Sequence, residues 1–193
     1  MNRYKHIILA LSAVIGGLLL FGSCRSGKPN TMGYDFESVV KKDYADMVGM
    51  YGDSAKLYVA CGYLNYTYEE IIDCGISLDS VYITNMFTIF QVGDTVVEIT
   101  HIEDVEDPVV EKNVGEWMEC RPITPETEIT AMEALGMFLS SGAVEDSACA
   151  PFANSIVLRF PYCIDNSRYC YLFGYDSVFV ILDEHGKLTR CSE

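Results

Sequence analysis

The stretch VYITNMFTIFQVGDTVVEITHI, residues 81–102, constrains the architecture of this chain more than any other. Two runs rich in β-branched and aromatic residues, 81–92 and 95–102, flank the dipeptide Gly93-Asp94. A two-residue connection that begins with glycine is typical of a β-hairpin, because glycine readily adopts the positive φ that such tight turns need. The stretch therefore predicts a pair of antiparallel strands.

Three elements are expected before this hairpin. Residues 36–51 place apolar side chains on one face at helical spacing, which predicts an amphipathic helix. Residues 56–64, KLYVACGYL, are typical of a strand. Thr67 and Glu70 have the spacing of a capping box, so we expect a short helix over residues 68–74.

The chain after the hairpin mixes loop, helix and strand signals. Residues 103–113 are acidic and contain a proline, which favours a loop, and residues 116–123 have the composition of a strand. Thr124-Pro125-Glu126 combines a capping hydroxyl, a proline at the first position and an acid near the positive helix end, so we expect a helix from there to Ser140. Residues 143–153 are expected to form a loop, and strands are expected at 155–160, 168–175, 177–182 and near Cys191.

The order of helix, strands, helix and strands indicates an α+β fold, with the helices packed on one face of an antiparallel sheet. We expect a single α+β domain over residues 36–193. Because each part begins with a helix and continues with strands, residues 36–113 and 114–193 are candidate halves of similar build.

The last part of the chain carries a family resemblance. It runs from the Thr124 helix to VFVILDEHGKLTR, where Gly186 precedes the basic Lys187 in the final hairpin. This order resembles a PepSY-like module, which pairs a helix with a small antiparallel sheet. Such modules usually bind or inhibit other proteins, often secreted proteases, so the resemblance implies a protein-interaction or protease-inhibitor-like role.

The N-terminus has the features of an export signal. Arg3 and Lys5 lie in a short basic start, and residues 7–21 form an apolar run of 15 residues. This run is shorter than the about 20 residues that span a membrane and suits a secretory signal peptide. The following Gly22-Ser23-Cys24 resembles the lipobox of bacterial lipoproteins, although Phe21 stands where leucine is usual.

The lipobox resemblance implies a signal peptide over residues 1–23, acyl chains such as palmitate on Cys24 and a flexible tether over residues 24–35. Several acyl chains anchor a protein stably. Neither an aspartate nor an acidic cluster follows Cys24, and by resemblance to lipoprotein sorting signals this favours the periplasmic face of an outer membrane. An ordinary signal peptide with a coincidental cysteine and a retained membrane helix are the alternatives.

Aspartate followed by a hydroxyl residue and a small or aliphatic residue occurs five times. The pattern resembles the O-glycosylation motif of Bacteroidota-type secreted proteins. The alternative is structural, because Asp-Ser favours turns before strands. The resemblance would place sugars on Ser54, Ser80, Thr95, Ser147 and Ser177.

The charge of the chain is strongly acidic. All 28 acidic residues follow residue 23, whereas Arg3 and Lys5 are two of the 13 basic residues. The remainder therefore has 11 basic and 28 acidic side chains, a formal net charge of −17. Nucleic acids bind through lysines and arginines that neutralise phosphates, so this charge argues against a nucleic-acid partner.

Seven cysteines remain besides Cys24, and disulfides are common in exported proteins. An odd number leaves at least one thiol unpaired in a monomer. Cys163 and Cys170 flank a predicted turn and are the candidate disulfide. No C-x-x-C motif supports a zinc site, so structural use of the cysteines is favoured over a reactive thiol.

No motif of a catalytic, metal or cofactor site appears. His101 and His185 are read as surface or turn histidines, because no local pattern gives either one a nucleophile and an orienting group. The acidic run lacks the spaced loop of calcium sites and is read as a solvated loop; it contains Glu103, Asp104, Glu106, Asp107 and Glu111.

These observations favour a membrane-anchored, non-enzymatic binding or accessory lipoprotein that presents a small domain to a protein partner. A glycan-binding surface lipoprotein is one alternative, because tyrosines on strands can form a binding surface as well as pack a sheet. An enzyme that uses a free cysteine or carboxylates is the other. The tyrosines concerned are Tyr58, Tyr63, Tyr66, Tyr68, Tyr162, Tyr169, Tyr171 and Tyr175.

Overall fold

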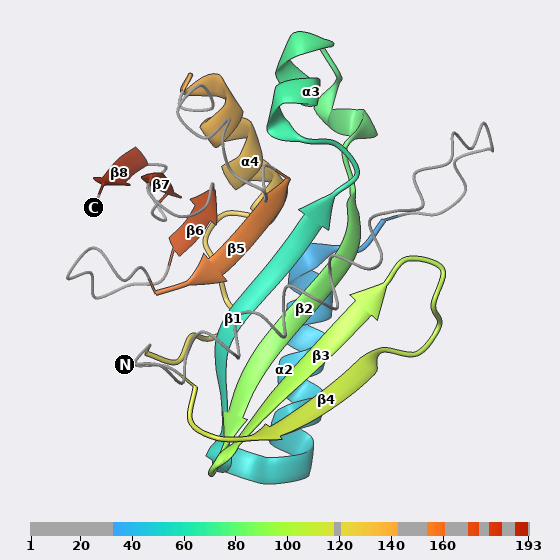
Figure 1. The fold of residues 1–193 in the computed structure, drawn as a ribbon, viewed down its shortest axis with the longest axis vertical. Coiled ribbons are helices and arrows are strands. Elements are labelled where there is room, and N and C mark those ends of the chain that lie inside the picture. The colour runs from blue at the N-terminus through green and yellow to red at the C-terminus, as the bar shows by residue number, and fades with distance from the viewer. Residues whose placement is uncertain are drawn as a thin grey trace. The chain divides into compact units, whose positions relative to one another are not determined.

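The α+β class expected from the sequence is confirmed by the computed structural model (Figure 1). It describes residues 33–117, 121–142, 154–160, 170–173, 178–182 and 188–192. The helices are α2 (Phe36–Tyr51), α3 (Tyr68–Asp73) and α4 (Ala131–Ser140), with 3-10 turns η1 (Gly52–Ser54) and η2 (Leu78–Ser80). The strands are β1 (Ala55–Leu64), β2 (Ile83–Val92), β3 (Thr95–Ile102), β4 (Val109–Val114), β5 (Ser155–Arg159), β6 (Cys170–Phe173), β7 (Val178–Leu182) and β8 (Leu188–Ser192).

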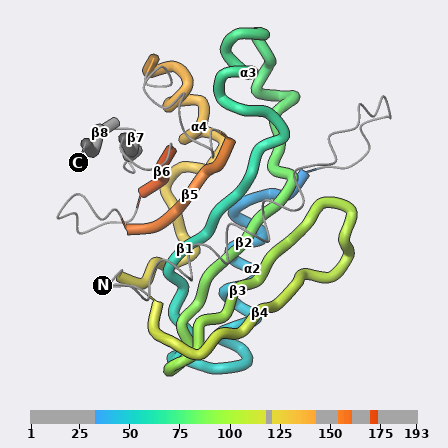
Figure 2. Tube along the Cα trace, viewed as in Figure 1, coloured from blue at the N-terminus to red at the C-terminus, as the bar shows by residue number. Residues whose placement is uncertain are grey.

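The strands form one antiparallel sheet of eight in the order β4-β3-β2-β1-β5-β6-β7-β8. Each half of the chain supplies a helix followed by a four-stranded meander, α2 with β1 to β4 and α4 with β5 to β8. The two meanders join where β1 pairs with β5, for example at Ala60 opposite Leu158, and each then runs outward to its own edge. The Cα trace in Figure 2 shows how β4 comes to lie at one edge of this sheet.

The helices pack on one face of the sheet and share one hydrophobic core with it. In Figures 1 and 2, α2 lies behind the strands of the first meander. In the second half, Phe138 of α4 stacks on Phe173 of β6 with ring centroids 4.6 Å apart, and Tyr68 of α3 meets Phe138 edge-on at 5.0 Å. Aromatic pairs at these separations are favourable beyond the area they bury, so this cluster fixes α3 and α4 on the sheet.

Local sequence patterns predicted a helix, a hairpin turn and a capping box at the positions where the structure has them. The helix α2 covers the predicted residues 36–51, and the hairpin turns at Gly93, whose φ of +61° lies in the region that glycine adopts without strain. The side chains of Thr67 and Glu70 form the expected capping box at the start of α3. In such a box, two backbone N–H groups that lack a partner inside the helix are bonded reciprocally.

Three predictions of secondary structure were wrong. The expected loop over 103–113 contains a strand, β4, in its second part, because pairing with β3 outweighs the weak local pattern. The described residues of the stretch 116–123 make no strand, only an isolated bridge at Ile123. The helix expected from Thr124 begins at Ala131, because Thr130 and Glu133 form a full capping box there.

Other predictions fall outside the described residues. They concern the signal peptide, Cys24 and most of the tether, the loop over 143–153, Cys163, His185, Ser147 and Ser177. Among the helices that the structure describes, none has the length and apolar character needed to cross a bilayer.

Candidate functional site

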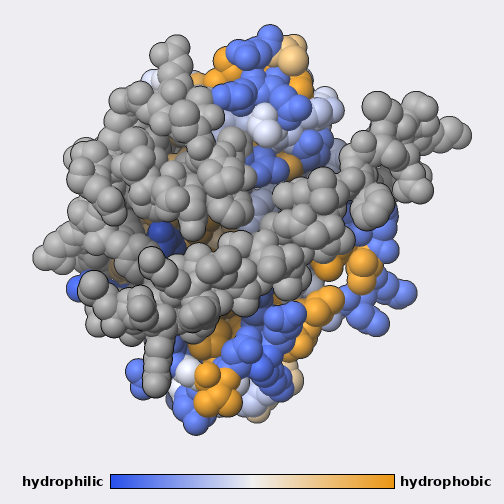
Figure 3. Space-filling model, viewed as in Figure 1, coloured by the Kyte–Doolittle hydropathy of each residue, from blue (hydrophilic) through white to orange (hydrophobic). Residues whose placement is uncertain are grey.

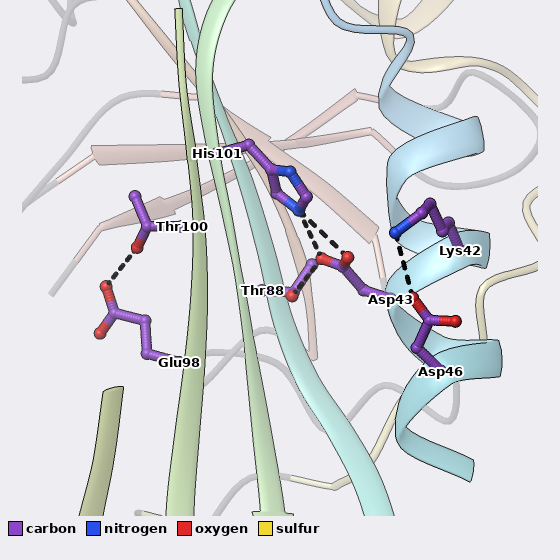
Figure 4. A network of polar contacts seen from close by, with 7 residues as sticks. All are labelled: Lys42, Asp43, Asp46, Thr88, Glu98, Thr100 and His101. Atoms are coloured by element: carbon purple, nitrogen blue, oxygen red, sulfur yellow. Dashed lines mark hydrogen bonds and ion pairs between the residues drawn. The ribbon is translucent and has the colours of Figure 1, made fainter. Parts of the chain in front are cut away.

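A buried carboxylate links α2 to the sheet (Figure 4). Asp43 is only 2% exposed and lies on the face of α2 that packs against the strands. Its carboxylate accepts a hydrogen bond of 2.7 Å from the Thr88 hydroxyl on β2. The Nε2 atom of His101 on β3 lies 3.0 Å from both carboxylate oxygens. Because an ionised carboxylate only accepts hydrogen bonds, Nε2 carries the proton that is shared with Asp43.

This cluster corrects the interpretation of His101 as a surface or turn histidine. The side chain of His101 is 11% exposed, and its ring meets the ring of Tyr34 edge-on at 5.8 Å. Among the described residues, Asp43 is its only polar partner. A histidine that acts as a base for a nucleophile needs that nucleophile within hydrogen-bond reach, and the hydroxyl present, Thr88, donates to the carboxylate instead. The hydrogen bonds of Asp43 therefore link α2 to β2 and β3.

A second feature is the exposed edge formed by β4. All six residues of this strand are exposed, and Val109, Val110 and Val114 are 44%, 50% and 87% exposed. In the view of Figure 3, hydrophobic side chains lie among hydrophilic ones over the part of the surface where Figure 1 places β3 and β4. Edge strands of natural sheets are usually short, charged or covered, because their unpaired backbone groups can pair with another chain. An exposed edge that carries valines is therefore a candidate contact surface.

The register shows which backbone groups β4 leaves open. Val97 of β3 lies opposite Lys112, and the N–H of Gly115 donates to the carbonyl of Asp94 at 2.7 Å. Because hydrogen-bonded and non-hydrogen-bonded pairs alternate along an antiparallel ladder, residues 109, 111 and 113 direct their backbone groups to β3. Val110, Lys112 and Val114 direct theirs away from the sheet, and none of these outward groups bonds to another described residue.

Two carboxylates face each other beside this edge. Glu98 of β3 lies directly opposite Glu111 of β4, on the face of the sheet away from the helices. Burial raises the pKa of the Glu98 carboxyl, a hydrogen bond from Thr100 at 3.2 Å lowers it, and the charge of Glu111 raises it further. Among the described residues, no cation lies within ion-pair distance of either carboxylate. Like charges directly opposite each other in a sheet are destabilising, and no described cation offsets the repulsion between Glu98 and Glu111.

The surroundings of the edge are acidic. From residue 98 to residue 116 the chain has seven carboxylate side chains and a single lysine, Lys112. The ammonium group of Lys112 donates to the Tyr51 hydroxyl at 3.0 Å and lies 5.7 Å from the centre of its ring. This lysine is therefore held on the helix side of the sheet. Within the described residues, no three histidine, cysteine or acidic side chains are gathered where they could hold a metal ion.

The described cysteines occupy different environments. Cys61 on β1 is buried, and its burial raises the pKa of the thiol to about 12, so almost no thiolate forms at neutral pH. Cys74 lies at the exposed end of α3, and Cys170 is buried on β6. A nucleophile of the kind considered in the sequence needs a lowered pKa, which Cys61 does not have.

Three hydroxyl residues of the aspartate motif are described: Ser54 and Ser80 end the 3-10 turns before β1 and β2, and Thr95 is the first residue of β3. The hydroxyl of Ser54 donates to the carbonyl of Tyr51 at 2.6 Å, whereas Ser80 is exposed and its hydroxyl has no partner among the described residues. Thr95 is half-buried beside the hairpin turn. Both interpretations of the motif, as turn chemistry and as a sugar acceptor, stay open at these positions.

Two of the tyrosines considered for a binding surface are buried, and three others, Tyr162, Tyr169 and Tyr175, lie outside the described residues. Tyr68 and Tyr171 are buried, and their hydroxyl groups make internal hydrogen bonds, Tyr68 to the carbonyl of Ser155 and Tyr171 to Glu37 at 3.1 Å. The same Glu37 carboxylate accepts from the first N–H of α4 at 2.7 Å. These tyrosines hold the two halves of the chain together.

Sequence reasoning missed Asp43, Thr88 and β4. The signal for Asp43 was present, because it lies three residues after Val40 and four before Met47, within the apolar face of the predicted helix.

Comparisons with protein-family models, with curated proteins and with solved structures find no match for this chain.

Proposed function

We propose that this chain is a lipid-anchored accessory protein of the cell envelope, which binds a protein partner through β4 and carries out no chemical step itself. The observation that carries the proposal is the exposed edge of β4, with three outward-directed backbone pairs and exposed valines. Addition of a strand to an open sheet edge is a recurring way to bind an extended protein segment, because main-chain hydrogen bonds supply affinity without a pocket.

In this proposal, acyl chains on Cys24 anchor the protein at the periplasmic face of an outer membrane. The support comes from the lipobox-like Gly22-Ser23-Cys24 and from the polar residues that follow it. An anchor of this kind raises the local concentration of the domain near other envelope proteins, so a weak edge contact becomes effective. Replacing Cys24→Ser should release the chain from the membrane fraction, whereas a serine at the buried, internal Cys61 should leave it there.

A photo-crosslinking amino acid tests the binding surface in intact cells. We would place it at Val114, which is 87% exposed, and as a matched control at Met137 of α4, which is also apolar and 42% exposed. The proposal expects a discrete crosslinked protein from position 114 that is weakened in the Cys24→Ser background. The same products from both positions, or none from position 114, would contradict the proposal.

A further inference from the structure

We propose that the partner segment at β4 is an extended, basic peptide that adds as a ninth strand, with a lysine or arginine opposite Glu111. This inference rests on the proposed function of β4 as a docking edge and specifies the chemistry of its occupant. It is carried by the geometry of the Glu98–Glu111 pair and by the direction of the outward backbone groups of β4.

The register determines which side chains an added strand would place on each face. We take the added strand as antiparallel to β4, like every pair in this sheet. Val110, Lys112 and Val114 then supply the hydrogen-bonding positions, so the position opposite Glu111 belongs to a non-hydrogen-bonded pair. In such pairs the Cα atoms are about 4.5 Å apart and the side chains approach most closely. A side chain opposite Glu111 therefore lies beside its carboxylate, on the same face as Glu98.

Charge complementarity selects a cation for that position. Glu111 and Glu98 have no described counter-charge, and Lys112 is bound to Tyr51 on the other face. The turn between β3 and β4 adds four further carboxylates, at Glu103, Asp104, Glu106 and Asp107. A lysine or arginine opposite Glu111 would turn a repulsive pair into a bridged one, whereas an acidic segment would add to the repulsion.

The same argument disfavours a second copy of this chain as the occupant. Two β4 edges that pair with each other would bring two strands with the same Glu111 and the same acidic turn together. The valines favour an apolar residue at the positions that face Val110 and Val114. The expected partner segment therefore alternates apolar and basic residues.

The test uses the full lipidated chain in detergent and four capped peptides of six residues, the length of β4. Valine alternates with lysine in the first peptide, with glutamine in the second and with glutamate in the third. A fourth, the lysine peptide with N-methyl groups on alternate backbone nitrogens, lacks the donors for strand addition. Dissociation constants and the location of the contact are read from backbone amide shifts in NMR spectra.

We expect amide shifts at Val110, Lys112 and Val114, and binding of the lysine peptide about fivefold tighter than that of the glutamine peptide. The glutamate and N-methylated peptides should bind more weakly than the glutamine peptide. Raising the salt from about 0.01 M to about 1 M shortens the Debye length from about 30 Å to about 3 Å and should remove the preference for lysine. The variant Glu111→Gln should lose that preference, and Glu116→Gln, which removes a charge outside the strand, should keep most of it.

The outcomes separate this inference from the proposed function. Equal binding of the lysine and glutamine peptides at β4 would overturn the basic partner and leave edge docking intact. Shifts that appear away from β4, or equal binding of the N-methylated peptide, would overturn docking at the edge itself. Concentration-dependent shifts at β4 without any peptide would identify a second copy as the occupant and overturn the inference.

Discussion

Replacing Asp43→Ala should destabilise the chain far more than the position of this residue on a surface helix suggests. The carboxylate is 2% exposed and is bound by the Thr88 hydroxyl at 2.7 Å and by His101 Nε2 at 3.0 Å. A hydrogen bond to a charged group contributes about 1.5–3 kcal/mol, and Asp43→Ala removes the acceptor for both Thr88 and His101. We expect a loss of about 3–5 kcal/mol in the free energy of unfolding.

Two further variants divide this loss among the contacts. Thr88→Val keeps the volume and removes one hydroxyl, so it should cost about 1–3 kcal/mol. His101→Ala should cost nearly as much as Asp43→Ala, because it leaves a buried carboxylate with one partner. In the double variant the two losses should not add, and the coupling energy should be about 1–3 kcal/mol. Asp46→Ala is the control, because its pair with Lys42 is more than half exposed and should contribute under about 0.5 kcal/mol.

Denaturant unfolding followed by the fluorescence of the single tryptophan, Trp117, provides the free energies. The reasoning would be refuted by losses for Asp43→Ala and His101→Ala that add within about 0.5 kcal/mol, since independent sites behave in this way. It would also fail if Asp43→Ala cost no more than Asp46→Ala.

Four other expectations follow from the described contacts. The pKa of Glu98 is raised in the folded chain, so its ionised form lowers stability above that pKa, and stability is regained as the pH falls toward 4.5, the ordinary pKa of a glutamate side chain. Glu98→Gln should therefore stabilise the chain at neutral pH, with a benefit that shrinks in urea unfolding curves as the pH approaches that value. An alkylating reagent at pH 8 should label the exposed Cys74 quickly and Cys61 only after unfolding, and peptide mass spectrometry would show the labelled sites. Rapid labelling of Cys61 would be inconsistent with its burial and with its pKa of about 12. Thr130→Ala removes the capping box of α4 and should lower the melting temperature by the equivalent of about 1 kcal/mol, while a Thr130→Ser chain should melt near the wild type. If the aspartate motif accepts sugars, intact mass measurements on the chain purified from its native cells should show a hexose-containing adduct that Ser80→Ala reduces, and an unchanged mass would favour the turn interpretation.

The elements that local chemistry specifies could be predicted from the sequence. The glycine-first turn at Gly93 and the capping box at Thr67 each depend on neighbours within a few residues, and both were placed correctly. The start of α4 was misplaced because the sequence offers two capping signals, and it is Thr130 with Glu133 that forms the full capping box at the start of the helix.

The features that depend on distant partners could not be placed in advance. The strand β4 has all six residues exposed and no apolar alternation, so only its pairing with β3 defines it. Asp43 and His101 are 58 residues apart. The helical pattern places Asp43 on a buried face, yet no local rule names the imidazole that approaches it. The same limit applies to Glu98 and Glu111, whose opposition is set by the register of two strands.

Amide hydrogen exchange along β4 in the free chain tests whether its edge is open. The amides of residues 109, 111 and 113 point to β3 and should be protected, whereas those of Val110, Lys112 and Val114 should exchange at nearly the rate of unstructured peptides. Protection of all six amides would show that another segment already covers the edge. Loss of protection at every position would show that β4 is not paired, and either result would contradict the proposed docking surface.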